Sequence, residues 1–153
     1  MLKVAKYLSL ALFMTALLPL GAQQLPGRHP AYLHALTDLR SARWCLMHQA
    51  GDRKVYEGED VAIQEIEAAI REIKMASIDD GKNLEDHPPI DVSDHGSRLL
   101  KSIEFLKKAK ADVDGAEDNP DVRELRHRAN DHIARATEAA ERAHKAWLHE
   151  MGR

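Results

Sequence analysis

The sequence contains an internal repeat, in which residues 33–76 match residues 100–143, 67 positions later, in their pattern of apolar residues. The superposed apolar pairs are Leu36 with Ile103, Leu39 with Leu106, Ala42 with Ala109, Leu46 with Val113, Val55 with Val122, Ala62 with Ala129, Ile66 with Ile133, Ala69 with Ala136, Ile73 with Ala140 and Ala76 with Ala143. Their spacing is helical on both sides of a turn, so each copy predicts a helical hairpin. One hairpin cannot bury its apolar face, whereas two packed together can. The repeat therefore predicts an all-α four-helix bundle made of two related hairpins.

The first 22 residues have the features of a secretory signal peptide. Lys3 and Lys6 form a basic start, residues 7–20 are almost wholly apolar, and the small residues Gly21 and Ala22 follow. This order predicts export and cleavage after Ala22. The competing interpretation is a retained anchor, but the apolar run is shorter than the roughly 20 residues that span a membrane. We therefore expect a periplasmic or secreted protein without a membrane span in its mature chain.

The charge and the single cysteine limit the function further. Loss of Lys3 and Lys6 with the signal peptide changes the formal net charge from −3 to −5. This mild acidity argues against a nucleic-acid-binding protein, which would carry a basic patch. Cys45 has no second cysteine with which to form an internal disulfide. In an oxidising compartment such a thiol is sheltered, bound to a ligand, or paired with another chain in a homodimer.

The mature chain is long enough for one domain with a sizeable core. We expect a lead-in over residues 23–30 and a four-helix bundle over 31–153, with a first hairpin at about 31–78, a linker at 79–94 and a second hairpin at about 95–151. Within the hairpins the expected helices span about 31–50, 59–78, 95–113 and 121–151. The linker has no helical period and is longer than most connections in bundles. It is therefore either a crossover or surface strap, or a functional loop.

Nine histidines, all in the mature chain, are the main compositional indication of function. Imidazole binds copper, nickel and zinc, and side chains three or four positions apart on a helix can share an ion. Two such pairs lie in the first expected helix, His34 with Asp38 and Cys45 with His48, on the side opposite its apolar stripe. The two pairs cannot form one site, because 14 residues of helix rise about 21 Å. Each pair needs further ligands from a neighbouring chain or from the loop around His87.

Two Glu-x-x-His motifs occur in the last expected helix, Glu124 with His127 and Glu141 with His144. Each is a two-ligand metal candidate. A di-iron centre needs such motifs at one level on two different helices, whereas these are about 25 Å apart on one helix. The pattern therefore does not indicate an oxygen-activating enzyme.

Other chemistries are indicated less well. The linker acids Asp79, Asp80, Glu85 and Asp86 lack the ligand spacing and closing glutamate of a calcium loop. Cys45 with His48 lacks a third, orienting group for nucleophilic catalysis. Met47, Met75 and Met151 are expected to fill gaps in the core. The sequence contains no catalytic motif that we recognise, and we expect a protein that is not an enzyme.

Two stretches resemble exported bacterial helical-bundle proteins of unassigned activity: residues 29–40 (HPAYLHALTDLR) and 78–89 (IDDGKNLEDHPP). Residues 132–136 (HIARA) and 141–144 (ERAH) are similar to small periplasmic metal-binding bundles. The first resemblance implies a non-catalytic binding or structural module of the cell envelope, whose partner is an unknown envelope protein. The second implies a low-capacity copper, nickel or zinc binder. Both hypotheses are kept.

Overall fold

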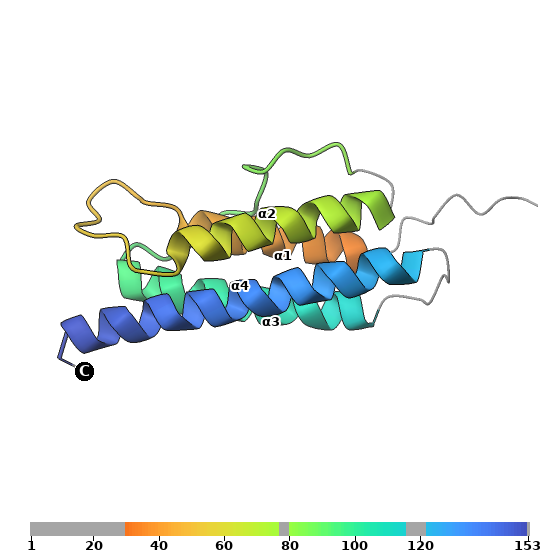
Figure 1. Ribbon diagram of the computed structural model, residues 1–153. Helices are drawn as coiled ribbons and strands as arrows, with labels where there is room; N and C mark the ends of the chain where they lie inside the picture. Colours follow the sequence, from red (N-terminus) through yellow and green to blue (C-terminus); the bar gives the residue numbers. More distant parts are fainter. Residues whose placement is uncertain (1–29, 77–79, 116–121, 153) are drawn as a thin grey trace, which may run out of the picture.

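The computed structural model describes residues 30–76, 80–115 and 122–152. These residues form four helices, α1 (Pro30–Leu46), α2 (Glu59–Ala76), α3 (His95–Asp114) and α4 (Arg123–Glu150), and no strand (Figure 1). The predicted all-α four-helix bundle is confirmed. The predicted signal peptide and the lead-in up to His29 lie outside the described residues, as do residues 116–121 between the last two expected helices.

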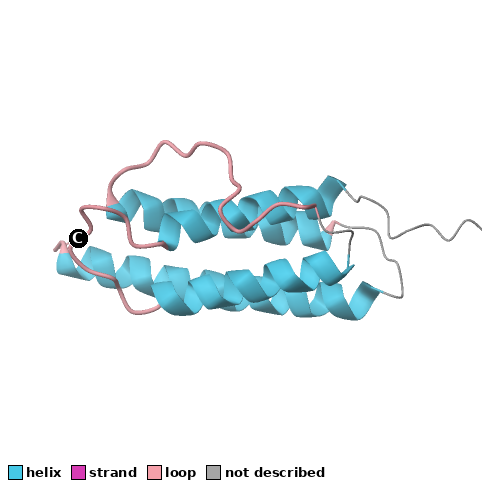
Figure 2. Cartoon of the chain, turned by 90° about the horizontal axis from the view of Figure 1, so that it is seen from above, coloured by secondary structure: helices cyan, strands magenta, loops and turns pink. Residues whose placement is uncertain are grey.

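Each helix packs against two antiparallel neighbours. α1 contacts α2 and α3, and α4 contacts the same two helices, with the most extensive packing between α2 and α4 and between α1 and α3. The connection between α2 and α3 returns along the length of the bundle, so these two diagonal helices run in the same direction (Figures 1 and 2). One long crossover of this kind is an established way to connect a four-helix bundle.

The core consists of the apolar residues that the repeat pairs. Apart from the pair Val55 and Val122, both members of every pair are buried. Each large aliphatic side chain removed from water in this way stabilises the fold by about 1.5–3 kcal/mol. The buried face of α4 is rich in alanine, which lets neighbouring backbones approach closely. At Gly58, where φ is +107°, an added Cβ would lie 2.4 Å from the carbonyl oxygen of Ala139.

α1 ends at Leu46, earlier than the expected end near Ala50. The chain leaves the helix into a turn in which Gln49 N donates to Asp52 Oδ2 at 2.8 Å and Asp52 N donates to Gln49 O at 3.0 Å. Met47 N still donates to Arg43 O at 3.0 Å, but at Gln49 the Asp52 side chain replaces the helical acceptor. α3 begins at His95, as expected, because Asp94 Oδ1 accepts a hydrogen bond from Ser97 N at 2.9 Å.

Two methionines that we expected in the core are on the surface. The exposed fraction is 60% for Met75 and 53% for Met151, each of which lies at the end of a helix. The expectation from residue type was therefore wrong for these two residues.

The linker is a strap held on the surface of α1 and α2. Arg40 is fully buried and donates two hydrogen bonds of 2.8 Å to the carboxylate of Asp80. One turn further along α1, Arg43 lies 2.8 Å from both Glu67 of α2 and Glu85 of the strap. The ring of Trp44 contacts that of His87 at a centroid distance of 5.3 Å. The described part of the linker, residues 80–94, is thus both the crossover between α2 and α3 and a strap on the bundle surface.

Candidate ligand-binding pocket

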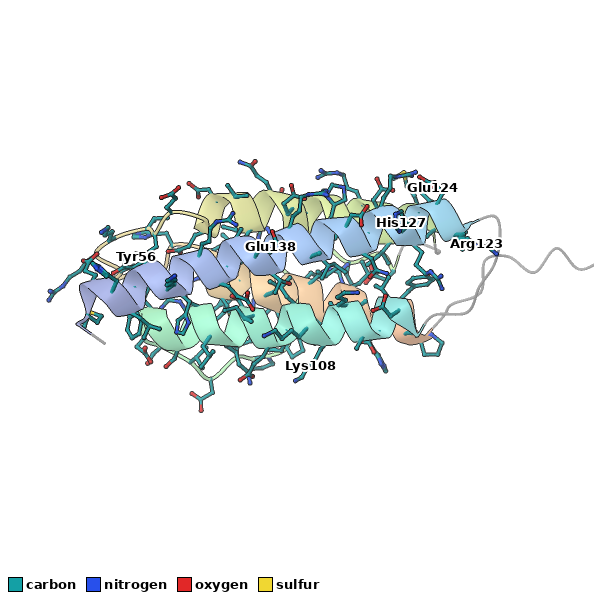
Figure 3. The ribbon with its side chains drawn as sticks, turned by 60° about the horizontal axis from the view of Figure 1, so that its bottom comes forward. Tyr56, Lys108, Arg123, Glu124, His127 and Glu138 are labelled. Carbon is teal, nitrogen blue, oxygen red and sulfur yellow. The ribbon has the colours of Figure 1, made fainter. Side chains whose placement is uncertain are left out.

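A pocket of about 630 Å³ opens at the end of the bundle where α1 and α4 end and α2 and α3 begin. Three short segments line it, which we call together the end pocket: residues 50–56, residues 93–95 and the last turn of α4 from Trp147 to Met151. Tyr56 marks this end in Figure 3, far from Arg123 at the opposite end of α4. The end pocket therefore lies where the first hairpin meets the second.

A network of four buried or half-buried ionisable residues lies at and beneath the floor of the end pocket. His95 Nε2 is 2.9 Å from Glu59 Oε1, and its Nδ1 is 3.7 Å from Asp52 Oδ1. Arg98 donates to Asp52 Oδ2 and, at 2.8 Å, to the carbonyl oxygen of Ser93. Glu59 Oε1 also accepts from Tyr56 N at 2.6 Å. These contacts fix the loop between α1 and α2 to the start of α3.

The two carboxylates of the network have opposite pKa shifts. Burial raises the pKa of Glu59, although the Tyr56 N–H and His95 oppose this effect. Burial also disfavours ionisation of Asp52, but hydrogen bonds from Arg98 and from Gln49 N outweigh it and lower the pKa of Asp52. Asp52 is thus held as the charged partner of Arg98.

Aromatic side chains form the walls of the end pocket. Trp147 packs directly on Gly96, where an added Cβ would lie 2.4 Å from the indole ring, and it stacks on His144 at a centroid distance of 6.0 Å. Tyr56 meets His95 edge to face at 5.3 Å. Close packing on a glycine and a ring neighbour leaves Trp147 little freedom to rotate.

One ion pair joins the walls across the two hairpins. Lys54 pairs with Glu150 of α4 and lies 5.1 Å above the ring of Tyr56. Both charged groups are about half exposed, so the pair contributes little to stability. Its consequence is geometric, because it holds the loop against the last turn of α4.

Of the two predicted metal-ligand pairs of α1, only one stays together. His34 and Asp38 line a shallow depression of about 380 Å³ between α1 and α3, together with Lys108 and Asp112. Burial, followed by the charge of Asp112, raises the pKa of Asp38.

Cys45 and His48 are placed differently from the prediction. Cys45 is buried instead of lying on the polar face, and burial raises the pKa of its thiol to about 12. His48 is exposed and follows the end of α1, so the expected one-turn pairing with Cys45 is lost.

The metal candidates of α4 have other neighbours. Glu124 and His127 are exposed, and they lie together toward the opposite end of the bundle from Tyr56 in Figure 3. His127 Nε2 faces Asp131 at 3.7 Å. Glu141 pairs with Lys107 at 3.3 Å, while His144 stacks on Trp147. Within residues 30–76, 80–115 and 122–152, no three histidine, cysteine or carboxylate side chains form a group that could hold a metal ion.

The described acids that were weighed as calcium ligands have partners within the protein, and Asp86 accepts a hydrogen bond from Asn83 N at 2.9 Å. Asp80 pairs with Arg40, and Glu85 pairs with Arg43. Asp79 lies outside the described residues.

Comparison of the chain with protein-family models, with characterised proteins and with solved structures finds no match. Of the helices in the described ranges, none combines the length and the apolar character needed to cross a membrane.

The sequence interpretation missed the network beneath the end pocket. One signal was present, because one of its members is a position where the repeat fails. Glu59 corresponds to Arg126. A charged residue in one copy that the other copy does not share indicates a role outside the common framework.

Proposed function

We propose that this chain is an exported, non-catalytic binding module of the cell envelope, and that its ligand binds in the end pocket. The observation that carries the proposal is a pocket of about 630 Å³ that aromatic side chains line in part, with a floor fixed by the largely buried His95–Glu59 and Arg98–Asp52 hydrogen bonds. Its volume is in the range of small-molecule sites, roughly 300–1,000 Å³. Such sites combine apolar surface with positioned polar groups, and the end pocket places Tyr56, Trp147 and Met151 beside a larger number of polar side chains.

The environment of His95 supports binding over acid–base chemistry. Both ring nitrogens face carboxylates, Nε2 that of Glu59 and Nδ1 that of Asp52. A general base must instead reach a proton of the substrate. Asp52 is likewise engaged with Arg98 and Gln49 N, so these groups hold the pocket in shape.

Export is part of the proposal because of residues 1–22. Their basic start, apolar run and small final residues are the pattern that directs a chain across the inner membrane. An envelope location would expose the end pocket to compounds of the periplasm or of the cell exterior.

The proposal is tested by asking what the purified protein retains from an envelope extract. The mature chain is mixed with the low-molecular-weight fraction and passed through a gel-filtration column, and the retained compounds are identified by mass spectrometry. Ala50 lines the end pocket and is exposed, so an Ala50→Trp variant places an indole ring at its wall. Ala146→Trp, on the exposed side of α4, is the matched control.

We expect the native chain and Ala146→Trp to retain the same compound unmodified, and Ala50→Trp to lose it. Equal retention by Ala50→Trp would show that the end pocket is not the binding site. Conversion of the compound would show that the protein is an enzyme.

One observation bears on the alternative function, binding of copper, nickel or zinc. His34, Asp38 and Asp112 line one depression, although as they stand they do not form a group that could hold a metal ion. A metal-binding protein purified from the periplasm without a histidine tag would contain stoichiometric metal. One ion would raise its melting temperature by several degrees, an effect lost in His34→Ala. Without bound metal or a shift, the alternative is wrong.

A further inference from the structure

The acidic side chains around the end pocket already have partners. Asp52 accepts from Arg98 and from Gln49 N, Asp94 caps α3 through Ser97 N, and Glu150 pairs with Lys54. A cationic ligand would compete with a lysine, an arginine or a backbone N–H for each of these carboxylates. The acids of this pocket therefore hold the structure together. Their number does not indicate that the ligand is a cation.

Arg53 is the exception among the charged residues that line the end pocket. It is exposed, and its guanidinium forms no hydrogen bond or ion pair with any residue that the structure describes. Its backbone position is nevertheless well fixed. Asp52, on one side, is held by Arg98, and Tyr56 N, on the other, donates to Glu59. A guanidinium with free donors at a pocket rim is well suited to bind a carboxylate through two parallel hydrogen bonds.

Apolar surface next to Arg53 indicates what else the ligand carries. Trp147 and Tyr56 line the same pocket, and the side chain of Met151 is 53% exposed. Flat rings also pack favourably against the edges of aromatic side chains, and methionine accommodates varied apolar shapes. We infer that the end pocket binds an organic anion with a flat apolar body, whose carboxylate pairs with Arg53 while its ring packs on the aromatic walls. This inference rests on the proposed function.

Three probes of one shape but different charge test the inference. Indole-3-acetate carries a carboxylate, indole-3-acetamide is neutral, and tryptamine is a cation. Their affinities for the mature chain are measured by isothermal titration calorimetry at pH 7. Arg53→Gln removes the cation, and Arg71→Gln on the exposed side of α2 is the matched control. Ala50→Trp reports whether binding occurs in the end pocket.

We expect indole-3-acetate to bind about tenfold more tightly than indole-3-acetamide. One charge-assisted contact, here between Arg53 and the carboxylate, increases affinity by about that factor. Arg53→Gln should abolish this preference and leave the affinity for the amide unchanged, while Arg71→Gln retains both. Ala50→Trp should weaken all binding.

Two results would overturn the inference in different ways. Tightest binding of tryptamine, blocked by Ala50→Trp, would show that the pocket is a binding site for cations. If no probe binds the native chain more tightly than it binds Ala50→Trp, the end pocket is not a site for such anions. The retention experiment described above then decides on the proposed function by itself.

Discussion

Replacement of Arg40 by methionine is the sharpest test of how the strap is held on the bundle. The change keeps an unbranched side chain of similar length and removes the guanidinium. Arg40 is fully buried, and the Asp80 side chain is only 7% exposed. Two hydrogen bonds of 2.8 Å join them, so the change leaves a nearly buried carboxylate whose remaining cation, Lys74 Nζ, is 3.7 Å away.

The expected loss follows from that burial. Removal of one partner from a buried ion pair typically costs about 3–5 kcal/mol, because the remaining charge is desolvated without compensation. Lys74 stays 3.7 Å from Asp80 and compensates part of that charge, so we expect a loss of about 2–4 kcal/mol. A domain of this size has a total stability of about 5–15 kcal/mol, so Arg40→Met should fold but unfold at much lower urea concentration. The double variant Arg40→Met/Asp80→Asn should recover part of the loss, because it removes the uncompensated charge as well.

Urea unfolding followed by far-ultraviolet circular dichroism measures these free energies. The repeat provides a matched control, since Lys107 is the counterpart of Arg40, is 65% exposed and pairs with Glu141 on the surface. Lys107→Met should change the unfolding free energy by no more than about 1 kcal/mol. A loss below about 1 kcal/mol in Arg40→Met, or no recovery in the double variant, would refute the reasoning.

Three further predictions concern the core, the thiol and the response to acid. Gly58→Ala should reduce the unfolding free energy by about 2–4 kcal/mol, because φ is +107° and the added Cβ would lie 2.4 Å from the carbonyl oxygen of Ala139 in α4. Gly51→Ala, with φ +100° and open space, should cost only about 1 kcal/mol in the same urea experiment. Burial raises the pKa of Cys45 to about 12, so its reaction with a thiol reagent at pH 8 should be slow in the native protein and fast in urea; fast native reaction would contradict this placement. Although burial opposes ionisation of Asp80, its hydrogen bonds from Arg40 lower its pKa below the ordinary 3.8. The stabilisation that ionised Asp80 provides is therefore complete above pH 3.8 and is lost as the pH falls through the pKa of Asp80 in the folded protein. Asp80→Asn should therefore flatten the dependence of the unfolding free energy on pH between about pH 5 and pH 2. An unchanged slope would disprove the pairing.

The repeat predicted the core well because helical periodicity reports directly on which side of a helix is apolar. Leu36 and Ile103, or Ile66 and Ile133, are buried as pairs for that reason. The same periodicity failed for Cys45, which the phase of the helix placed on the polar side. Burial of that residue is decided by the neighbouring helices, whose position a single helix does not reveal.

The charged sites depend on contacts between distant parts of the chain. Arg40 meets Asp80, 40 positions later, and Arg98 meets Asp52, 46 positions earlier. Arginine is usually exposed, so residue type alone favours the wrong environment for both. The end of α1 was missed for a related reason, since Asp52, which closes the turn, is itself held by Arg98. The end pocket could not be predicted because its three lining segments meet only in the folded bundle.

The two tryptophans of the chain allow a direct test of the end pocket. Trp147 lines the pocket, whereas Trp44 lies under the strap against His87. In nitrogen-15-labelled protein, each indole N–H gives one signal in a two-dimensional NMR spectrum. Titration with the low-molecular-weight envelope fraction should shift the Trp147 signal in a saturable way and leave the Trp44 signal in place. A shift of Trp44 alone, or no shift of either signal at saturating extract, would contradict binding in the end pocket.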